Sequence, residues 1–199
     1  MALNNDATLV VKTGRFYIAP VGTEAPTNLT APGEPWEELG HTSVEDILSW
    51  ATEGGEATTL GSLQSPSLRT TSSPRTESFT TTLLQWDEET LPFYFGGNME
   101  LISGSDIFYG VNSNPDPIQK ALLIVLRDGQ NAFPIYAPST SITRADDLSI
   151  DSTEDLAGLP ITINLQNYQG NEWSFAVAPV AAVGSVDPGE GDGGDGSGE

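Results

Sequence analysis

The sequence predicts a mainly β protein: antiparallel strands in two sheets, forming a sandwich or barrel with one flanking helix. Short runs rich in Thr, Val, Ile and aromatic residues recur along the chain and are separated by Gly, Pro, Asn and Asp. Only one segment carries strong helix signals. The 199 residues include no cysteine and are enough for one domain with a sizeable core. We expect that domain to span residues 1–184, followed by a separate tail at 185–199.

The β-rich runs predict nine strands. In one of them Phe79, Thr81 and Leu83 alternate with residues that face the other way, which is the period of a strand. The Asp128-Gly129 pair between two runs is a strong hairpin signal. The expected strands are Thr8–Val21, Ala57–Gln64, Glu77–Trp86, Asp106–Val111, Lys120–Asp128, Ala132–Pro138, Ser139–Ala145, Leu159–Tyr168 and Glu172–Val180.

The helix is expected to begin after Asp87, a suitable N-cap that two glutamates follow. Pro92 limits it to about two turns, and the glycine pair that starts at Gly96 ends it. Its apolar face consists of Leu91, Tyr94 and Phe95. The segment Ser152–Pro160 is expected to add one further turn, capped by Ser152 or Thr153.

A polar segment separates two of the expected strands. It runs from Ser65 to Ser78, is interrupted by two prolines, and carries two of the five arginines. Only Leu68 within it is suited to burial, so the segment is not expected to join the core. Two interpretations remain open: a solvated loop, or an arm that becomes ordered against a partner.

The net charge of −21 comes from 28 acids and seven basic residues. Such a surface repels phosphate backbones and disfavours ordinary nucleic-acid binding. The basic residues form no patch: Lys12, Arg15, Arg69, Arg75, Lys120, Arg127 and Arg144. The segment Asp187–Glu199 holds five of the acids and no apolar residue, which predicts a disordered tail. The rest of the chain is therefore acidic as well.

The N-terminal segment has neither the basic region nor the apolar run of a signal peptide. No apolar run approaches the roughly 20 residues that a membrane-spanning helix needs. We therefore expect a protein without an export signal and without a membrane partner.

His41, the only histidine, lies in the acidic stretch EELGHTSVEDILSW. A catalytic histidine needs a nucleophile or a proton donor within reach, but the chain has no cysteine and no serine flanked by the glycines of a nucleophile elbow. The residues Gly40, His41, Thr42 and Ser43 are instead typical of a structural turn.

Carboxylate pairs such as Glu45-Asp46 and Asp146-Asp147 keep a β-sandwich glycosidase as an alternative. Adjacent strand residues face opposite sides, however, and most of these pairs lie at strand ends or helix starts, where solvation explains them. No calcium-loop spacing and no phosphate-binding loop is present. The sequence therefore predicts no catalytic, cofactor or metal site.

Three segments together resemble the major tail tube proteins of long-tailed bacteriophages, particularly those that infect actinobacteria. The first segment is residues 4–47, which end in GHTSVEDI. The second is residues 53–97, from EGGEATTLGSLQ to LPFYFGG, and the third is residues 141–165, SITRADDLSIDSTEDLAGLPITINL. The resemblance implies two β-sheets flanked by a helix. It also implies six-membered rings that stack into a tube around a tape-measure protein, with an acidic channel through which genomic DNA later passes without specific binding.

The resemblance gives the polar arm a role, because tube subunits of this kind reach the adjacent ring through a long inter-strand loop. The candidate contact residues are Pro66, Leu68, Arg69 and Arg75, with the two arginines expected to meet carboxylates of another ring. The implied partners also include tail assembly chaperones and the distal tail and tail terminator proteins. The implied location is the virion tail, after synthesis in the host bacterial cytoplasm. A tail terminator or connector ring, and a tube wrapped by a contractile sheath, remain as alternatives.

Overall fold

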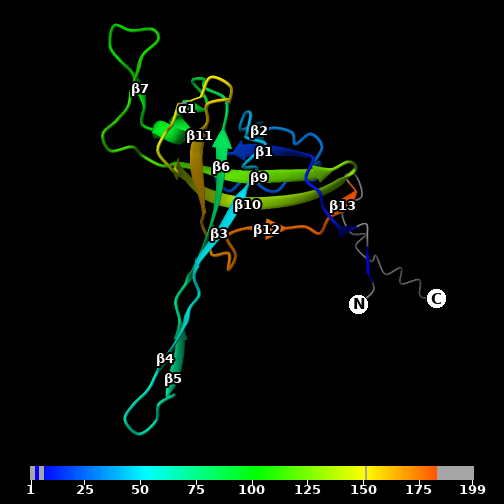
Figure 1. The fold of residues 1–199 in the computed structure, drawn as a ribbon, viewed down its shortest axis with the longest axis vertical. Coiled ribbons are helices and arrows are strands. Elements are labelled where there is room, and N and C mark those ends of the chain that lie inside the picture. The colour runs from blue at the N-terminus through cyan, green and yellow to red at the C-terminus, as the bar shows by residue number, and fades with distance from the viewer. Residues whose placement is uncertain (1–2, 5–6, 151, 183–199) are drawn as a thin grey trace, which may run out of the picture.

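The computed structural model describes residues 3–4, 7–150 and 152–182, and the predicted tail at 185–199 lies outside them. Within the described residues the fold is mainly β, with one nine-stranded antiparallel sheet, two small two-stranded sheets and a short helix (Figure 1). The elements in chain order are β1 Thr13–Ala19, β2 Glu37–Glu38, β3 Ser49–Gly54, β4 Ala57–Leu60, β5 Arg69–Ser72, β6 Arg75–Leu83, α1 Leu91–Phe95, β7 Glu100–Leu101, β8 Tyr109–Gly110, β9 Ile118–Asp128, β10 Asn131–Arg144, β11 Leu159–Leu165, β12 Ala176–Val177 and β13 Ala181–Ala182.

The large sheet runs in the order β2-β1-β9-β10-β11-β6-β3, and β12 and β13 also pair with β10. Strands β9 and β10 form the hairpin that Asp128-Gly129 predicts, with Gly129 at a φ of +62° in the turn. The two strands expected at 132–138 and 139–145 are one continuous strand, β10. A register shift between Ala137 and Thr140 accommodates Pro138, which has no N–H to donate.

The main core lies where the two halves of the large sheet face each other. Side chains of β1 and β9, such as Phe16 and Ile124, meet those of β6 and β11, such as Phe79 and Ile163. All four are nearly inaccessible to solvent. The two ends of the strand order, β2 and β3, do not pair in the described part of the chain. The sheet is therefore folded over like a sandwich, and its named strands do not show a closed barrel.

A second apolar cluster covers the other face of β1 and β9. Trp36 lies over this face, with its ring centroid 6.2 Å from that of Tyr136. The Trp36 indole N–H donates to the Glu24 carbonyl at 3.3 Å, and the Tyr136 hydroxyl donates to the Thr23 carbonyl at 2.7 Å. These contacts fix the proline-rich loop between β1 and β2 against the sheet.

The helix is shorter than the sequence predicts, because Thr90 and not Asp87 occupies its N-cap position. Asp87 instead opens a preceding turn, where its carboxylate accepts the Thr90 N–H at 3.0 Å. A hydrogen bond from Gln85, supported by the bonds from Thr90, holds the pKa of Asp87 below its ordinary value although burial opposes this. The further helical turn expected at Ser152–Pro160 does not form. The Ser152 hydroxyl does accept two backbone N–H groups at 3.2 Å, as a cap would.

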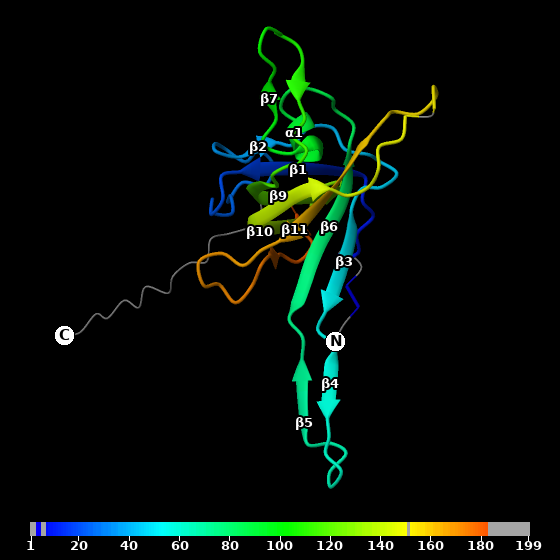
Figure 2. The same cartoon turned by 90° about the vertical axis from the view of Figure 1, so that its left-hand side faces the viewer.

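Two projections leave the body at opposite ends of the longest axis (Figures 1 and 2). One is a long hairpin in which β3 and β6 continue outward into β4 and β5. The other is the excursion between α1 and β9, which carries β7 and β8. Among the described residues, no helix has the length and apolar character to cross a membrane.

Candidate assembly surfaces

The outer half of the long hairpin, residues 57–72, has no core of its own. Strands β4 and β5 pair only with each other, and all of their residues are exposed. The Leu68 N–H donates to the Leu60 carbonyl at 2.8 Å, so the tip between them is an ordered turn. Three leucines at the tip, Leu60, Leu63 and Leu68, are 52%, 102% and 69% exposed. Apolar side chains gathered on a projection are typical of a surface that binds a partner.

The charge of residues 57–72 also differs from that of the rest of the chain. This stretch contains no carboxylate and one cation, Arg69, in a protein with a net charge of −21. Arg69 makes no ion pair with any residue that the structure describes. Residues 57–72 are therefore a positively charged segment of an otherwise acidic protein.

Glu77 links β3 to β6 at the base of the long hairpin. The period of a strand places Trp50 and Thr52 on one face of β3, and the register sets Thr52 opposite Glu77 on β6. The indole N–H of Trp50 and the Thr52 hydroxyl, the latter at 3.2 Å, donate to one oxygen of Glu77, and the Arg75 guanidinium donates to the other. Trp50 also contacts the Phe79 ring edge to face, with a centroid distance of 5.0 Å.

These contacts determine the ionisation of Glu77, whose side chain is almost fully covered. Burial alone would raise its pKa, but the hydrogen bonds from Trp50, Arg75 and Thr52 and the charge of Arg75 outweigh burial. The pKa of Glu77 is therefore lowered from the ordinary value of 4.5. A lowered pKa in the folded state means that the carboxylate contributes stability above pH 4.5, and that this contribution is lost as pH falls through the folded pKa.

Glu77→Gln is expected to lower the free energy of unfolding by about 1–2 kcal/mol at pH 7, because the neutral amide loses the charge-assisted bonds from a largely exposed arginine. Urea unfolding between pH 3 and 7 measures this. The difference between the two proteins should be full at pH 6–7 and shrink below the ordinary glutamate pKa of 4.5, where the wild-type side chain becomes protonated. A difference that stays constant down to pH 3 would contradict the assignment.

Gly40 to Ser43 pairs with the end of β6 as a short extension of the sheet. The His41 carbonyl accepts the Leu84 N–H at 2.8 Å, and the Ser43 N–H donates to the Thr82 carbonyl at 2.9 Å. Gly40 has a φ of +104°, which favours glycine. The described residues contain no group of three or more histidine and acidic side chains able to hold a metal ion. The structural role of these four residues stays a prediction.

The second projection, residues 97–117, is also apolar at its end. Five of its side chains are between 47% and 74% exposed: Leu101, Ile102, Ile107, Phe108 and Val111. Its charged residues are all acidic: Glu100, Asp106 and Asp116. The sequence analysis expected Asp106–Val111 to be a strand, of which only Tyr109–Gly110 forms one, and it did not identify these apolar side chains as a surface.

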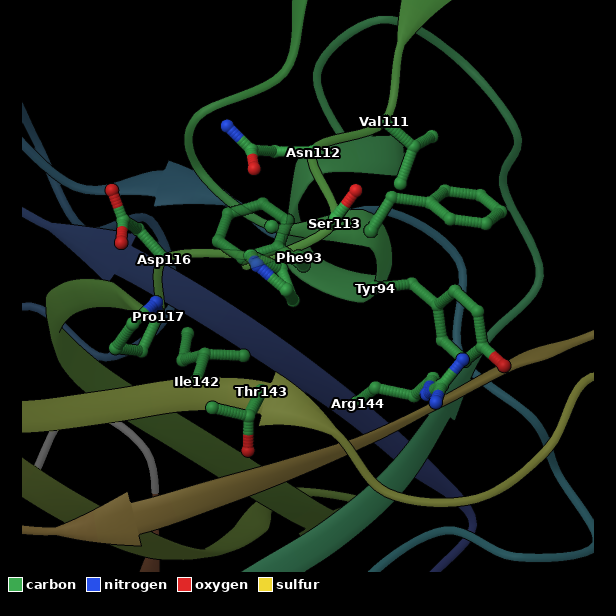
Figure 3. A pocket seen from close by; sticks show the side chains of 13 residues that line it. Phe93, Tyr94, Val111, Asn112, Ser113, Asp116, Pro117, Ile142, Thr143 and Arg144 are labelled. Carbon is green, nitrogen blue, oxygen red and sulfur yellow. The ribbon is translucent and has the colours of Figure 1, made fainter.

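A cavity of about 380 Å³ lies at the base of this projection, between α1 and β10 (Figure 3). Phe93, Val111 and Ile142 contribute apolar walls, and Asp116 is a polar residue at its margin. The guanidinium of Arg144 lies over the Tyr94 ring, 5.7 Å from the centroid. Asp116 is the one carboxylate in its lining, so the cavity does not bring together a pair of facing acids.

The structure places the four candidate arm residues in two different settings. Pro66, Leu68 and Arg69 are exposed at or beside the hairpin tip. Arg75 lies at the hairpin base, where Glu77 of the same chain already binds it. The expected pairing of an arginine with another ring therefore rests on Arg69 and stays a prediction. Leu60 and Leu63 belong to the same tip and were missed, although they stand out as apolar residues among Gly, Ser and Gln.

A folded-over sheet with two exposed apolar projections is typical of a protein that assembles with other chains. The sequence matches the profile of the phage tail tube protein family over residues 1–178. It is 31% identical over 182 residues to the major tail protein Gp23 of Mycobacterium phage L5, covering 85% of this chain and 89% of that protein. It is 30% identical over 199 residues to the major tail protein Gp23 of Mycobacterium phage D29, covering 90% and 98%.

The chain belongs to the phage tail tube protein family. It is therefore a structural protein of a phage tail and not an enzyme, which removes the glycosidase alternative. Membership also means that the chain assembles with copies of itself and with other tail components. The resemblance that the sequence analysis identified is confirmed.

Proposed function

We propose that six copies of the chain close into a ring and that the rings stack into a tube which conducts DNA. The observation that carries this proposal is the outer hairpin, residues 57–72, which presents three leucines and Arg69 beyond the core of its own subunit. Such a segment is stabilised by binding a second subunit. Ring closure and stacking are both heterologous contacts, in which one surface meets a different surface on the next copy.

The edges of the large sheet support the proposed contacts between neighbouring subunits of one ring. The large sheet ends at β3 on one side and at β2 on the other, and each presents an edge to which a neighbour can add. Joining these edges between subunits would continue the sheet around the ring. Six subunits would then share one inner wall.

The acidity of the chain supports a channel through which DNA slides. Duplex DNA carries one charge per ~1.7 Å, so a basic wall would arrest its transit. A wall of carboxylates repels it over a Debye length of ~8 Å at physiological salt. The net charge of −21 supports the proposal of such a wall, along which genomic DNA would pass without specific binding.

The proposal includes the other components of a long tail. The tape-measure protein occupies the channel before DNA, assembly chaperones deliver subunits, and distal tail and tail terminator proteins close the two ends. Subunits are made in the host bacterial cytoplasm and finish in the virion tail. A terminator function would need only a single ring, and the long exposed hairpin favours stacking instead.

Native mass spectrometry of the purified protein tests the ring. The expected result is a species of six times the 21.1 kDa chain mass, and multiples of it as rings stack. A different subunit number would contradict the hexamer. Closed six-membered rings that never stack at any concentration would favour the terminator function.

A further inference from the structure

The two projections complement each other in position, in apolar character and in charge. They lie at opposite ends of the longest axis (Figures 1 and 2), so a second copy displaced along that axis brings its hairpin tip toward the other projection. The tip exposes three leucines, and residues 97–117 expose five large apolar side chains. Both sets remain largely exposed among the residues that the structure describes.

The charges of the two projections favour this pairing over the other possible pairings of the same apolar surfaces. Residues 57–72 carry one positive charge and no carboxylate, whereas residues 97–117 carry three acids and no cation. Two hairpin tips would bring like charges together, and so would two excursions. The favourable combination joins one surface of each kind, and such a head-to-tail contact repeats without closing on itself.

We propose that the hairpin tip of one subunit docks on the excursion at residues 97–117 of a subunit in the next ring. Leu63, the most exposed side chain of the tip, packs among Ile107, Phe108 and Val111. Val111 also lines the 380 Å³ cavity, which extends the apolar surface toward Phe93 and Ile142 (Figure 3). Arg69 pairs with Asp106 at the rim. This inference rests on the proposed function, because it names the receptor for the stacking arm.

Cross-linking tests the contact directly, since the chain has no cysteine and any introduced thiol is unique. Leu63→Cys and Ile107→Cys are prepared separately, mixed in equal amounts, assembled and treated with a short bismaleimide. A dimer that forms only in the mixture is expected. The matched control replaces Ile107→Cys with Val177→Cys, an exposed apolar residue on β12 away from both projections, and should give no dimer.

The outcomes separate this inference from the proposed function. Tubes that form without the 63–107 cross-link, or that cross-link equally well through residue 177, would overturn the docking site and leave the tube intact. Failure of the unsubstituted chain to stack would overturn both.

A charge exchange adds a second readout. Arg69→Glu and Asp106→Arg should each raise the protein concentration needed for stacking about twofold to fivefold, the range for an exposed ion pair. The double variant should recover the original concentration, and equal weakening by the double variant would overturn the pairing.

Discussion

Replacing residues 57–72 with Asn-Gly is expected to give a folded protein that forms no tubes. The Ser73 N–H donates to the Glu56 carbonyl at 3.2 Å, so these two residues are spaced for a two-residue hairpin turn. The removed strands β4 and β5 pair with each other, and all of their residues are exposed. The free energy of unfolding should therefore change by less than about 1 kcal/mol, while stacking is lost.

Electron microscopy and light scattering measure the assembly of this variant, and urea unfolding measures its stability. Leu156→Ser is a suitable control, because Leu156 is 78% exposed and belongs to the connection between β10 and β11, which lies away from β4 and β5 (Figure 1). The control should assemble like the wild-type protein. Normal tubes from the truncated protein would contradict the role of the hairpin.

Phe79→Ala is expected to cost about 3–5 kcal/mol of the free energy of unfolding, the range for deleting a buried aromatic ring. Phe79 is fully buried in the main core and contacts both Trp50 and Phe175 edge to face, with centroid distances of 5.0 and 6.3 Å. Removing it leaves a cavity and also loosens Trp50, which donates to Glu77 at the hairpin base. The loss is a large part of the roughly 5–15 kcal/mol that stabilises a typical domain.

Denaturant unfolding measures the effect, and Phe108→Ala supplies the matched control. Phe108 is 63% exposed on the other projection, so the same substitution there should change the free energy of unfolding by less than about 1 kcal/mol. Equal losses at the two positions would contradict the assignment of Phe79 to the core.

Strands with one buried face were predictable from the sequence. The alternation of Phe79, Thr81 and Leu83 appears in β6 as a row of buried side chains, because a half-covered strand needs apolar residues only on its inner face. The turn at Asp128-Gly129 was equally clear, since its conformation favours these residues locally.

The elements that the sequence did not predict lack such a pattern. Strand β3 is exposed along its whole length and β5 is exposed on both faces, so neither shows alternation. The sequence analysis did not predict β3. It therefore could not predict the contacts of Glu77 with Trp50 and Thr52, because these depend on the β3–β6 register. Residues 65–76 of the polar arm stay outside the core as expected, but Glu77 is buried and part of the arm is strand and not loop. Family resemblance, rather than any chemical motif, indicated what the protein does.

Negative-stain electron microscopy across a concentration series tests the central claim of a self-assembling tube most directly. Light scattering is measured on the same samples at ordinary and raised ionic strength, because salt screens the repulsion between subunits that each carry a net charge of −21. Hollow tubes of regularly stacked rings, or hexamers that stack as concentration and salt rise, are the predicted result. A protein that remains monomeric under every one of these conditions would contradict the account.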